Sequence, residues 1–133
     1  MLTNSTPTGA SSPRMTKRRL LQVLLELLNE VPMRKGRLRK EHGVTHYDRN
    51  DAGKVVDVRI IVDPRNSPMV TITIHELLHV YMAVHHDIDR LFTESLEEAM
   101  VEALAESLTS YLHQPKNEKL LQKWLKAIER KLE

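Results

Sequence analysis

The stretch ITIHELLHVYM, residues 72–82, decides the fold and the chemistry that we expect of this chain. Residues four apart on an α-helix lie one turn apart on nearly the same face, so a helix here places His75 one turn from His79. Two imidazoles at that spacing can bind one zinc ion, each at about 2.0–2.1 Å. Glu76 lies about 100° further round the helix, where its carboxylate is beside the metal and can accept a proton from an attacking water. The HExxH spacing is therefore typical of a zinc-dependent hydrolase.

The uncharged neighbours of this motif favour a metal site over chance. With seven His and twelve Glu in 133 residues, random order produces an HExxH in about 3% of shuffled chains. The competing interpretation is a core helix that carries two incidental histidines. A helix around a metal must be buried, and the apolar residues on both sides of the motif meet that requirement. An acidic helix also follows at a distance that allows a carboxylate to reach the metal.

The composition limits the kinds of protein and ligand. The chain has 133 residues, of which 41% are hydrophobic and 29% charged, and this fits one globular domain. It contains no cysteine, so zinc has to be bound by histidine and carboxylate side chains. The net charge of +2 is too small to indicate nucleic acid. No apolar run approaches the roughly 20 residues of a membrane span, and the N-terminus lacks the apolar core of a secretory signal, so we expect a cytoplasmic protein without a membrane partner.

Residues 1–13 (MLTNSTPTGASSP) are rich in Ser, Thr and Pro and offer almost nothing for a core to bury. We expect a disordered leader, followed by a single domain over residues 14–133. Two basic runs lie near the start of this domain, at residues 17–19 and 33–41. We interpret them as a solvated helix start and as an exposed connector without interleaved aromatic residues.

The first half of the domain combines a helix with a hairpin. The helix begins after the capping residue Thr16 and ends at about Glu30. Two strand-like segments follow, at residues 43–47 and 54–62. The segment between them, residues 48–53, contains the Asp, Asn and Gly residues of a hairpin turn.

The second half is predicted to be helical. We place the motif helix at residues 68–85, although its β-branched first half also fits a strand. Thr93 or Ser95 caps the next helix, which continues to about His113, and a last helix covers about residues 117–132. The expected fold is therefore α+β, with a small antiparallel sheet packed on about four helices.

The order of these elements resembles a family of zinc enzymes. A strand, a helix with HExxH between apolar flanks, and a helix with a Glu about twenty residues on form the layout of the gluzincin metallopeptidases. More narrowly, the chain is similar to the very small gluzincin-like metallopeptidases of phages and bacteria, whose downstream pattern of Glu, Val and Leu-Ala matches residues 98–105. The resemblance covers about residues 55–115. It implies a zincin-like antiparallel sheet whose edge strand, residues 55–62, lies above the motif helix, where a peptide substrate can pair in extended form.

The resemblance also implies roles for individual residues. His75 and His79 become zinc ligands, and Glu76 becomes the general base. Glu98 becomes the third ligand. Glu102, one turn later, orients a ligand histidine, as the outer shell of zinc sites commonly does.

The residues themselves leave other roles open for these glutamates. Glu98 can instead close a capping box with Ser95, because Ser-x-x-Glu is a signature of helix starts. Glu94, Glu97 and Glu102 are alternative third ligands. Glu97 points nearer the middle of the apolar face than Glu98 does, which favours Glu97 mildly.

A second zinc geometry, HExxHxxGxxH, places its third ligand at His85. The glycine that lets the chain turn back towards the metal is replaced here by Met82. On an unbroken helix, His85 points about 120° away from His79 and lies about 9 Å along the axis, out of reach. We interpret His85, together with His86 and His113, as ordinary histidines at helix ends or on the surface.

The expected function is hydrolysis of peptide bonds by a zinc-activated water, with a peptide or protein as substrate. Tyr81, Tyr111 or His113 can supply the electrophile that stabilises the tetrahedral intermediate, and the sequence does not select among them. The alternative is a catalytically silent zinc-binding module that regulates another protein. Glu76 favours the enzyme, because a structural site has no need of it. A helical interaction protein without a metal is a third hypothesis, and the sequence does not predict an oligomeric state.

Overall fold

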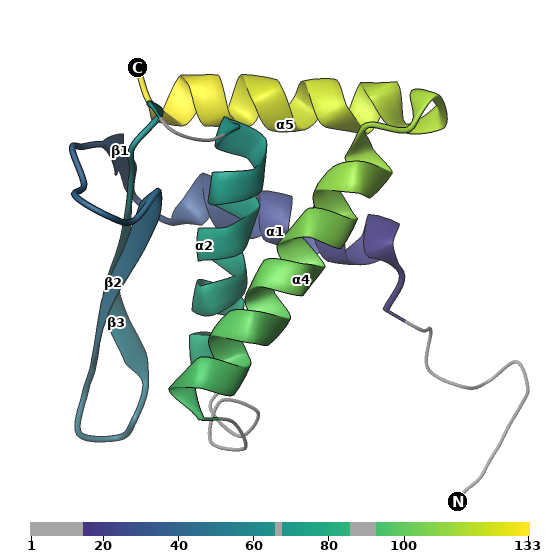
Figure 1. Cartoon of the computed structure of the whole chain (residues 1–133). Helices are drawn as coiled ribbons and strands as arrows, with labels where there is room; N and C mark the ends of the chain where they lie inside the picture. Colours follow the sequence, from purple (N-terminus) through teal and green to yellow (C-terminus); the bar gives the residue numbers. More distant parts are fainter. Residues whose placement is uncertain (1–14, 66–67, 86–92) are drawn as a thin grey trace, which may run out of the picture.

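The computed structural model describes residues 15–65, 68–85 and 93–133. Within these residues it has an α+β fold with a three-stranded sheet and four α-helices, which confirms the predicted class (Figure 1). No helix in this part of the chain is long and apolar enough to cross a membrane. The expected leader, residues 1–13, lies outside the described residues. The elements are α1 (Lys17–Glu30), β1 (Met33–Lys35), β2 (Gly43–Arg49), β3 (Val55–Val62), α2 (Met69–Val84), α4 (Glu94–Leu112), the short 3-10 helix η1 (Pro115–Asn117) and α5 (Glu118–Lys131).

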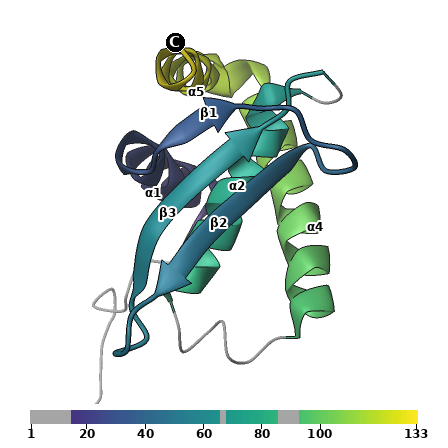
Figure 2. The ribbon, with the colours of Figure 1, turned by 90° about the vertical axis from the view of Figure 1, so that its left-hand side faces the viewer.

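The sheet has the strand order β1-β3-β2, with β3 in the middle (Figure 2). β2 and β3 form the antiparallel hairpin that the sequence predicts, and Gly53 in its turn has a φ of +82°. β1 runs parallel to β3, with Met33 opposite Ile60, so the sheet is mixed and the expectation of a purely antiparallel sheet is wrong. The expectation that Val55–Val62 is an edge strand is also wrong, because β1 pairs with one side of β3 and β2 with the other.

β1 escapes sequence-based prediction because it offers a single buried side chain. Met33 is buried, whereas Arg34 and Lys35 are exposed. Strand periodicity cannot be recognised in three residues, so only the pairing with β3 defines this strand. The interpretation of residues 33–41 as an exposed connector is therefore wrong for its first three residues.

The core lies between the sheet and the helices. Ile60 and Val62 of β3 are fully buried, and Figure 2 shows the opposite face of the sheet without a helix over it. α2 buries nine of its 16 residues, so it is the central helix of the domain. α5 closes one end through Trp124, which is fully buried. Burial of a large apolar side chain contributes about 1.5–3 kcal/mol to the stability of the fold. Because α2 buries more than half of its residues, packing fixes its position.

Threonine hydroxyls cap α1 and α4, the two helices for which the sequence predicts a capping residue. Thr16 accepts a hydrogen bond from the backbone N–H three residues on (3.1 Å), which confirms the predicted start of α1. Thr93 accepts the corresponding bond in α4 (3.2 Å), so Thr93 rather than Ser95 is the cap. Each hydroxyl satisfies an N–H that the first turn leaves without a helical partner. Because the cap is Thr93, Glu98 does not close a capping box with Ser95.

Thr73 is a position in α2 where the core carries an unsatisfied polar group. Its side chain is fully buried, and its hydroxyl has no hydrogen-bond partner among the described residues. A buried hydroxyl without a partner costs about 1–3 kcal/mol. We expect Thr73→Val, which keeps the shape of the side chain, to raise the free energy of unfolding by about 1 kcal/mol in urea denaturation. An unchanged or lower value would show that the hydroxyl is satisfied in solution.

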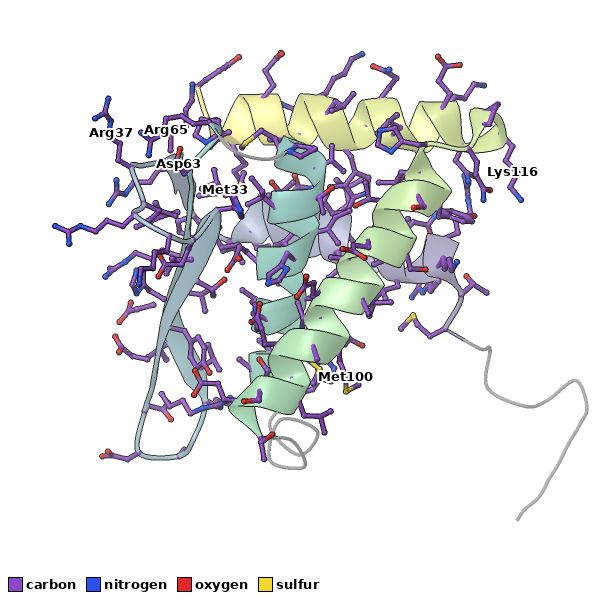
Figure 3. All side chains as sticks on the ribbon, in the orientation of Figure 1. Met33, Arg37, Asp63, Arg65, Met100 and Lys116 are labelled. Carbon is purple, nitrogen blue, oxygen red and sulfur yellow. The ribbon has the colours of Figure 1, made fainter. Side chains whose placement is uncertain are left out.

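Asp63, directly after β3, ties the loop between β1 and β2 to the sheet; Figure 3 shows it close to Arg65. Its carboxylate accepts hydrogen bonds from the N–H of Leu38 (3.0 Å) and from Nε of Arg65 (2.9 Å). Its own N–H donates to the carbonyl of His42 (2.8 Å). The hydrogen bonds from the Arg65 guanidinium hold the pKa of the Asp63 carboxyl well below its ordinary value.

We expect this ion pair to make stability fall in acid. Because the folded-state pKa of Asp63 is lowered, its contribution is complete above the ordinary value of 3.8 and is lost as the pH falls towards the folded-state pKa. The difference in unfolding free energy between wild type and Asp63→Asn should therefore shrink below about pH 4. Urea denaturation at neutral and acidic pH measures this difference, with Asp51→Asn in the exposed hairpin turn as the control. A difference that does not change with pH would contradict the role of the carboxylate.

Candidate metal centre

Two helices bring the candidate ligands together. α4 crosses α2 in the opposite direction (Figure 1), and His75 and His79 of α2 have ring centroids 5.1 Å apart. Glu98, near the start of α4, meets both rings: Oε1 lies 2.9 Å from Nε2 of His75, and Oε2 lies 2.9 Å from Nε2 of His79. One ligand atom from each of the three residues lies within 4.8 Å of the others. His75, His79 and Glu98 can therefore hold a metal ion.

His79 is held from its other side by Glu97. The Nδ1 atom of His79 lies 2.8 Å from Oε2 of Glu97. An ionised carboxylate only accepts hydrogen bonds, so Nδ1 carries a proton and donates it. In a neutral imidazole the other nitrogen, Nε2, then has a lone pair instead of a proton.

A lone pair on Nε2 fits a bound cation. Nε2 of His79 faces an oxygen of Glu98 at 2.9 Å, and two acceptor atoms at this distance repel each other. The contact becomes favourable when a proton lies between the two atoms, carried either by His79 or by Glu98, or when a metal ion lies between them. The second arrangement is the one that zinc proteins use, in which a ligand histidine donates its other N–H to a carboxylate.

The contacts of Glu98 with the two histidines are close to the spacing that zinc requires. Two ligand atoms on a tetrahedral zinc ion, each about 2.0–2.1 Å from the metal, are about 3.4 Å apart. Oε1 of Glu98 lies 2.9 Å from Nε2 of His75, and Oε2 lies 2.9 Å from Nε2 of His79. The Glu98 side chain is 52% exposed, so it can make the small adjustment to that spacing without disturbing the core. Two imidazoles and one carboxylate are also a donor set that catalytic zinc sites use.

Glu76 lies in the same site and is almost inaccessible to solvent, with 5% of its surface exposed. The hydroxyl of Thr45 donates a hydrogen bond to Oε1 of Glu76 (2.7 Å). Burial raises the pKa of the Glu76 carboxyl, and the bond from Thr45 and the neighbouring His75 and His79 oppose this rise. A carboxylate with a raised pKa accepts protons more readily near neutral pH, which suits a general base.

These residues line a cleft of about 960 Å³. Its lining comes from α4, from α2 and the residue before it, and from β2 and the two residues before it; β2 is the strand nearest α4 in Figure 2. Neither Lys nor Arg belongs to this lining among the described residues. The cleft is therefore anionic, although the whole chain carries a net charge of +2, and it attracts cations. Its acidic residues are Glu41, Glu76, Glu94, Glu97, Glu98, Glu102 and Glu106.

The structure distinguishes the positions of the four glutamates that the sequence leaves open as the third ligand. Glu98 lies beside both histidines, where a third ligand is expected. The contact with a candidate ligand histidine that was expected of Glu102 is made instead by Glu97, which lies 2.8 Å from His79. Glu102 lies one turn further along α4, about 6 Å along its axis from Glu98, and lines the cleft there. Glu94 also lines the cleft, but it is outside the cluster that can share an ion.

The alternative geometry with His85 as the third ligand is not formed. α2 continues without a break through Met82 and ends at Val84. His85 follows the helix, and its Nδ1 lies 2.9 Å from the carbonyl oxygen four residues earlier. His113 makes the same contact at the end of α4 (2.8 Å), so both are helix-end histidines, as expected. His86 lies outside the described residues.

The electrophile expected among Tyr81, Tyr111 and His113 is not supplied to this cleft by any of the three, because none of them lines it. Tyr47 and His42, for which no role was predicted from the sequence, do line it. A signal for Tyr47 was available: side chains alternate along a strand, and Gly43, Thr45 and Tyr47 of β2 all line the cleft.

Comparison of the chain with protein-family models, with curated proteins and with solved structures found no match. The geometry of this chain that favours a metal centre is the approach of Glu98 to two histidines, together with the hydrogen bond between Glu97 and His79.

Proposed function

We propose that this protein is a zinc-dependent metallopeptidase, similar to the gluzincins, that binds zinc through His75, His79 and Glu98. The observation that carries the proposal is the environment of His79. Glu97 fixes a proton on its Nδ1, while its Nε2 meets Glu98 beside Nε2 of His75. The buried carboxyl group of Glu76 lies in the same cleft and is available as a base.

Each residue has a separate task in the proposed reaction. Zinc, when bound, supplies a Lewis acid that polarises the scissile carbonyl and lowers the pKa of the attacking water. Glu76 accepts the proton of that water and passes it to the leaving amine. Glu97 keeps Nδ1 of His79 protonated, so that Nε2 stays available as a ligand. Glu98 adds the negative charge that two neutral imidazoles lack.

An extended peptide is the substrate that suits the cleft. β2 is at the edge of the sheet, and within the described residues no strand pairs with its outer side. Its backbone N–H and C=O groups can bind a peptide that lies along the cleft. The anionic lining favours peptides that carry Lys or Arg side chains. Lysine-containing peptides are therefore the probes of choice.

The first test is zinc binding by the wild-type protein. We expect one zinc ion per chain after equilibrium dialysis, and a melting temperature that rises with zinc and falls with a chelator. The reason is that an ion that binds only the folded state adds its binding free energy to folding, about 2.7 kcal/mol at a hundred times Kd. His79→Ala, which removes a ligand, should lose the response. Wild-type melting curves that superimpose in zinc and in chelator would contradict the metal site.

Hydrolysis separates the enzyme from a zinc-binding module without turnover. Zinc-loaded protein is expected to cleave fluorogenic peptides that contain lysine, and a chelator is expected to stop the cleavage. Tight zinc binding without cleavage of any such peptide would instead favour the silent module.

A further inference from the structure

We propose that Thr45 and Gly43 of β2 are positioning residues that fix the carboxylate of Glu76 and leave Oε2 as the oxygen that accepts the proton. The inference rests on the proposed hydrolase, in which Glu76 is the base. The two oxygens of this carboxylate then have different tasks, and the residues that determine those tasks lie on another element of the fold.

The contact with Thr45 fixes one oxygen. The Thr45 hydroxyl lies 2.7 Å from Oε1 of Glu76 and 3.2 Å from the backbone carbonyl oxygen of the same residue. A hydroxyl has one proton to donate. The carboxylate oxygen is closer than the backbone carbonyl oxygen and is the stronger acceptor, so it takes this proton. Oε1 is therefore engaged by β2, and a rotation that exchanges the two oxygens would break this hydrogen bond.

Gly43 determines how closely β2 approaches the other oxygen. A Cβ atom at this position would lie 2.9 Å from Cγ of Glu76, 3.1 Å from its Oε2 and 2.8 Å from Cγ2 of Ile72. Carbon atoms do not approach so closely without displacement, so any side chain here would push Glu76 away. Glycine allows the strand to lie directly against the carboxylate.

β2 is rigid enough to act as a positioning element. Gly43 pairs with Val62 and Thr45 pairs with Ile60 in the middle strand of the sheet. The residue before β2 is also fixed, because the carbonyl of His42 accepts the hydrogen bond from the N–H of Asp63. The two contacts with Glu76 therefore come from alternate positions, on one face of a strand that is paired along this segment.

The test separates the effect of the Thr45 hydroxyl from the effect of the shape of the side chain. Thr45→Val removes the hydroxyl and keeps the volume, whereas Thr45→Ser keeps the hydroxyl. Thr73→Val is the matched control, because it removes a buried hydroxyl from the helix that carries Glu76 but breaks no hydrogen bond among the described residues. The substrate is a lysine-containing fluorogenic peptide that wild type cleaves, and zinc affinity is measured by competition with a chromophoric chelator.

For Thr45→Val we expect kcat to fall by about 10- to 100-fold, with KM and zinc affinity within about 3-fold of wild type. Thr45→Ser should retain kcat within about 3-fold, and Thr73→Val should match wild type. Gly43→Ala should lower kcat as well, because its Cβ displaces the carboxylate. A wild-type kcat in Thr45→Val, or an equal loss in Thr45→Ser, would overturn the proposal.

A measurement without turnover keeps this proposal distinct from the hydrolase. In a double-mutant cycle for unfolding, Thr45→Val should destabilise wild type more than it destabilises Glu76→Leu, because the hydrogen bond is already absent in the second background. Additive effects would reject the contact even in an active enzyme. A non-additive cycle in a protein that binds zinc but cleaves nothing would reject the hydrolase, and with it the role of Oε2, while retaining the contact that fixes Glu76.

Discussion

Glu76→Gln is expected to bind zinc with wild-type affinity and to lose hydrolysis by at least about 100-fold. The amide has nearly the shape of the carboxylate, and its oxygen can still accept the hydrogen bond from Thr45. It cannot accept the proton of the attacking water at neutral pH. Because Glu76 is outside the cluster of possible ligands, the metal should be unaffected.

The measurement is single-turnover cleavage of a lysine-containing peptide by zinc-loaded protein. Glu129→Gln is the matched control, because it is the same substitution at an exposed position of α5 and should leave the rate unchanged. Cleavage by Glu76→Gln at the wild-type rate would remove Glu76 from its role as base. Loss of zinc from this variant would show that Glu76 is a ligand instead.

Glu98→Ala is expected to have the largest effect on the metal itself. It removes the only carboxylate of the ligand cluster and leaves two neutral imidazoles and water around the ion. Changes outside the ligand shell typically lower the affinity by about 10- to 100-fold. The loss in Glu98→Ala should exceed about 100-fold, which corresponds to about 2.7 kcal/mol of binding free energy.

Zinc affinity is measured by competition with a chromophoric chelator, for Glu98→Ala and for variants of neighbouring residues. The comparison tests which glutamate of α4 is the third ligand. Glu97→Ala should lower the zinc affinity by about 10- to 100-fold, because the Nδ1 atom of His79 then has lost its hydrogen-bond partner Glu97. Glu102→Ala, one turn further on, should change the affinity by less than about 3-fold. A variant of Glu97 or Glu102 that releases zinc more completely than Glu98→Ala would show that the third ligand is assigned to the wrong residue.

The sequence predicts those features that depend on neighbours along the chain. The 3.6-residue period and the threonine caps locate the helices, and the structure confirms the starts after Thr16 and Thr93. The HExxH motif likewise fixes the relative positions of His75 and His79, because both lie on one helix. The choice of Glu98 as the third ligand depended on the resemblance to a family, because the residues alone also allowed Glu94, Glu97 or Glu102 in that role.

Features that depend on pairing between distant segments could not be predicted in the same way. β1 has one buried residue, and its parallel pairing with β3 follows only from the folded chain. The contact of Thr45 with Glu76 joins residues 31 positions apart, and no local pattern signals it. Glu97 is an intermediate case: its place near the middle of the apolar face of α4 was a signal that it turns towards α2 rather than towards solvent.

Anomalous diffraction at the zinc absorption edge, from crystals of the full chain grown with zinc, can show whether His75, His79 and Glu98 bind one zinc ion. We predict one strong peak about 2.0–2.1 Å from Nε2 of both histidines and about 2.0–2.2 Å from an oxygen of Glu98, with Nδ1 of His79 still bound to Glu97. No peak at this cluster, or a zinc ion held by other residues, would show that these three residues are not the zinc site.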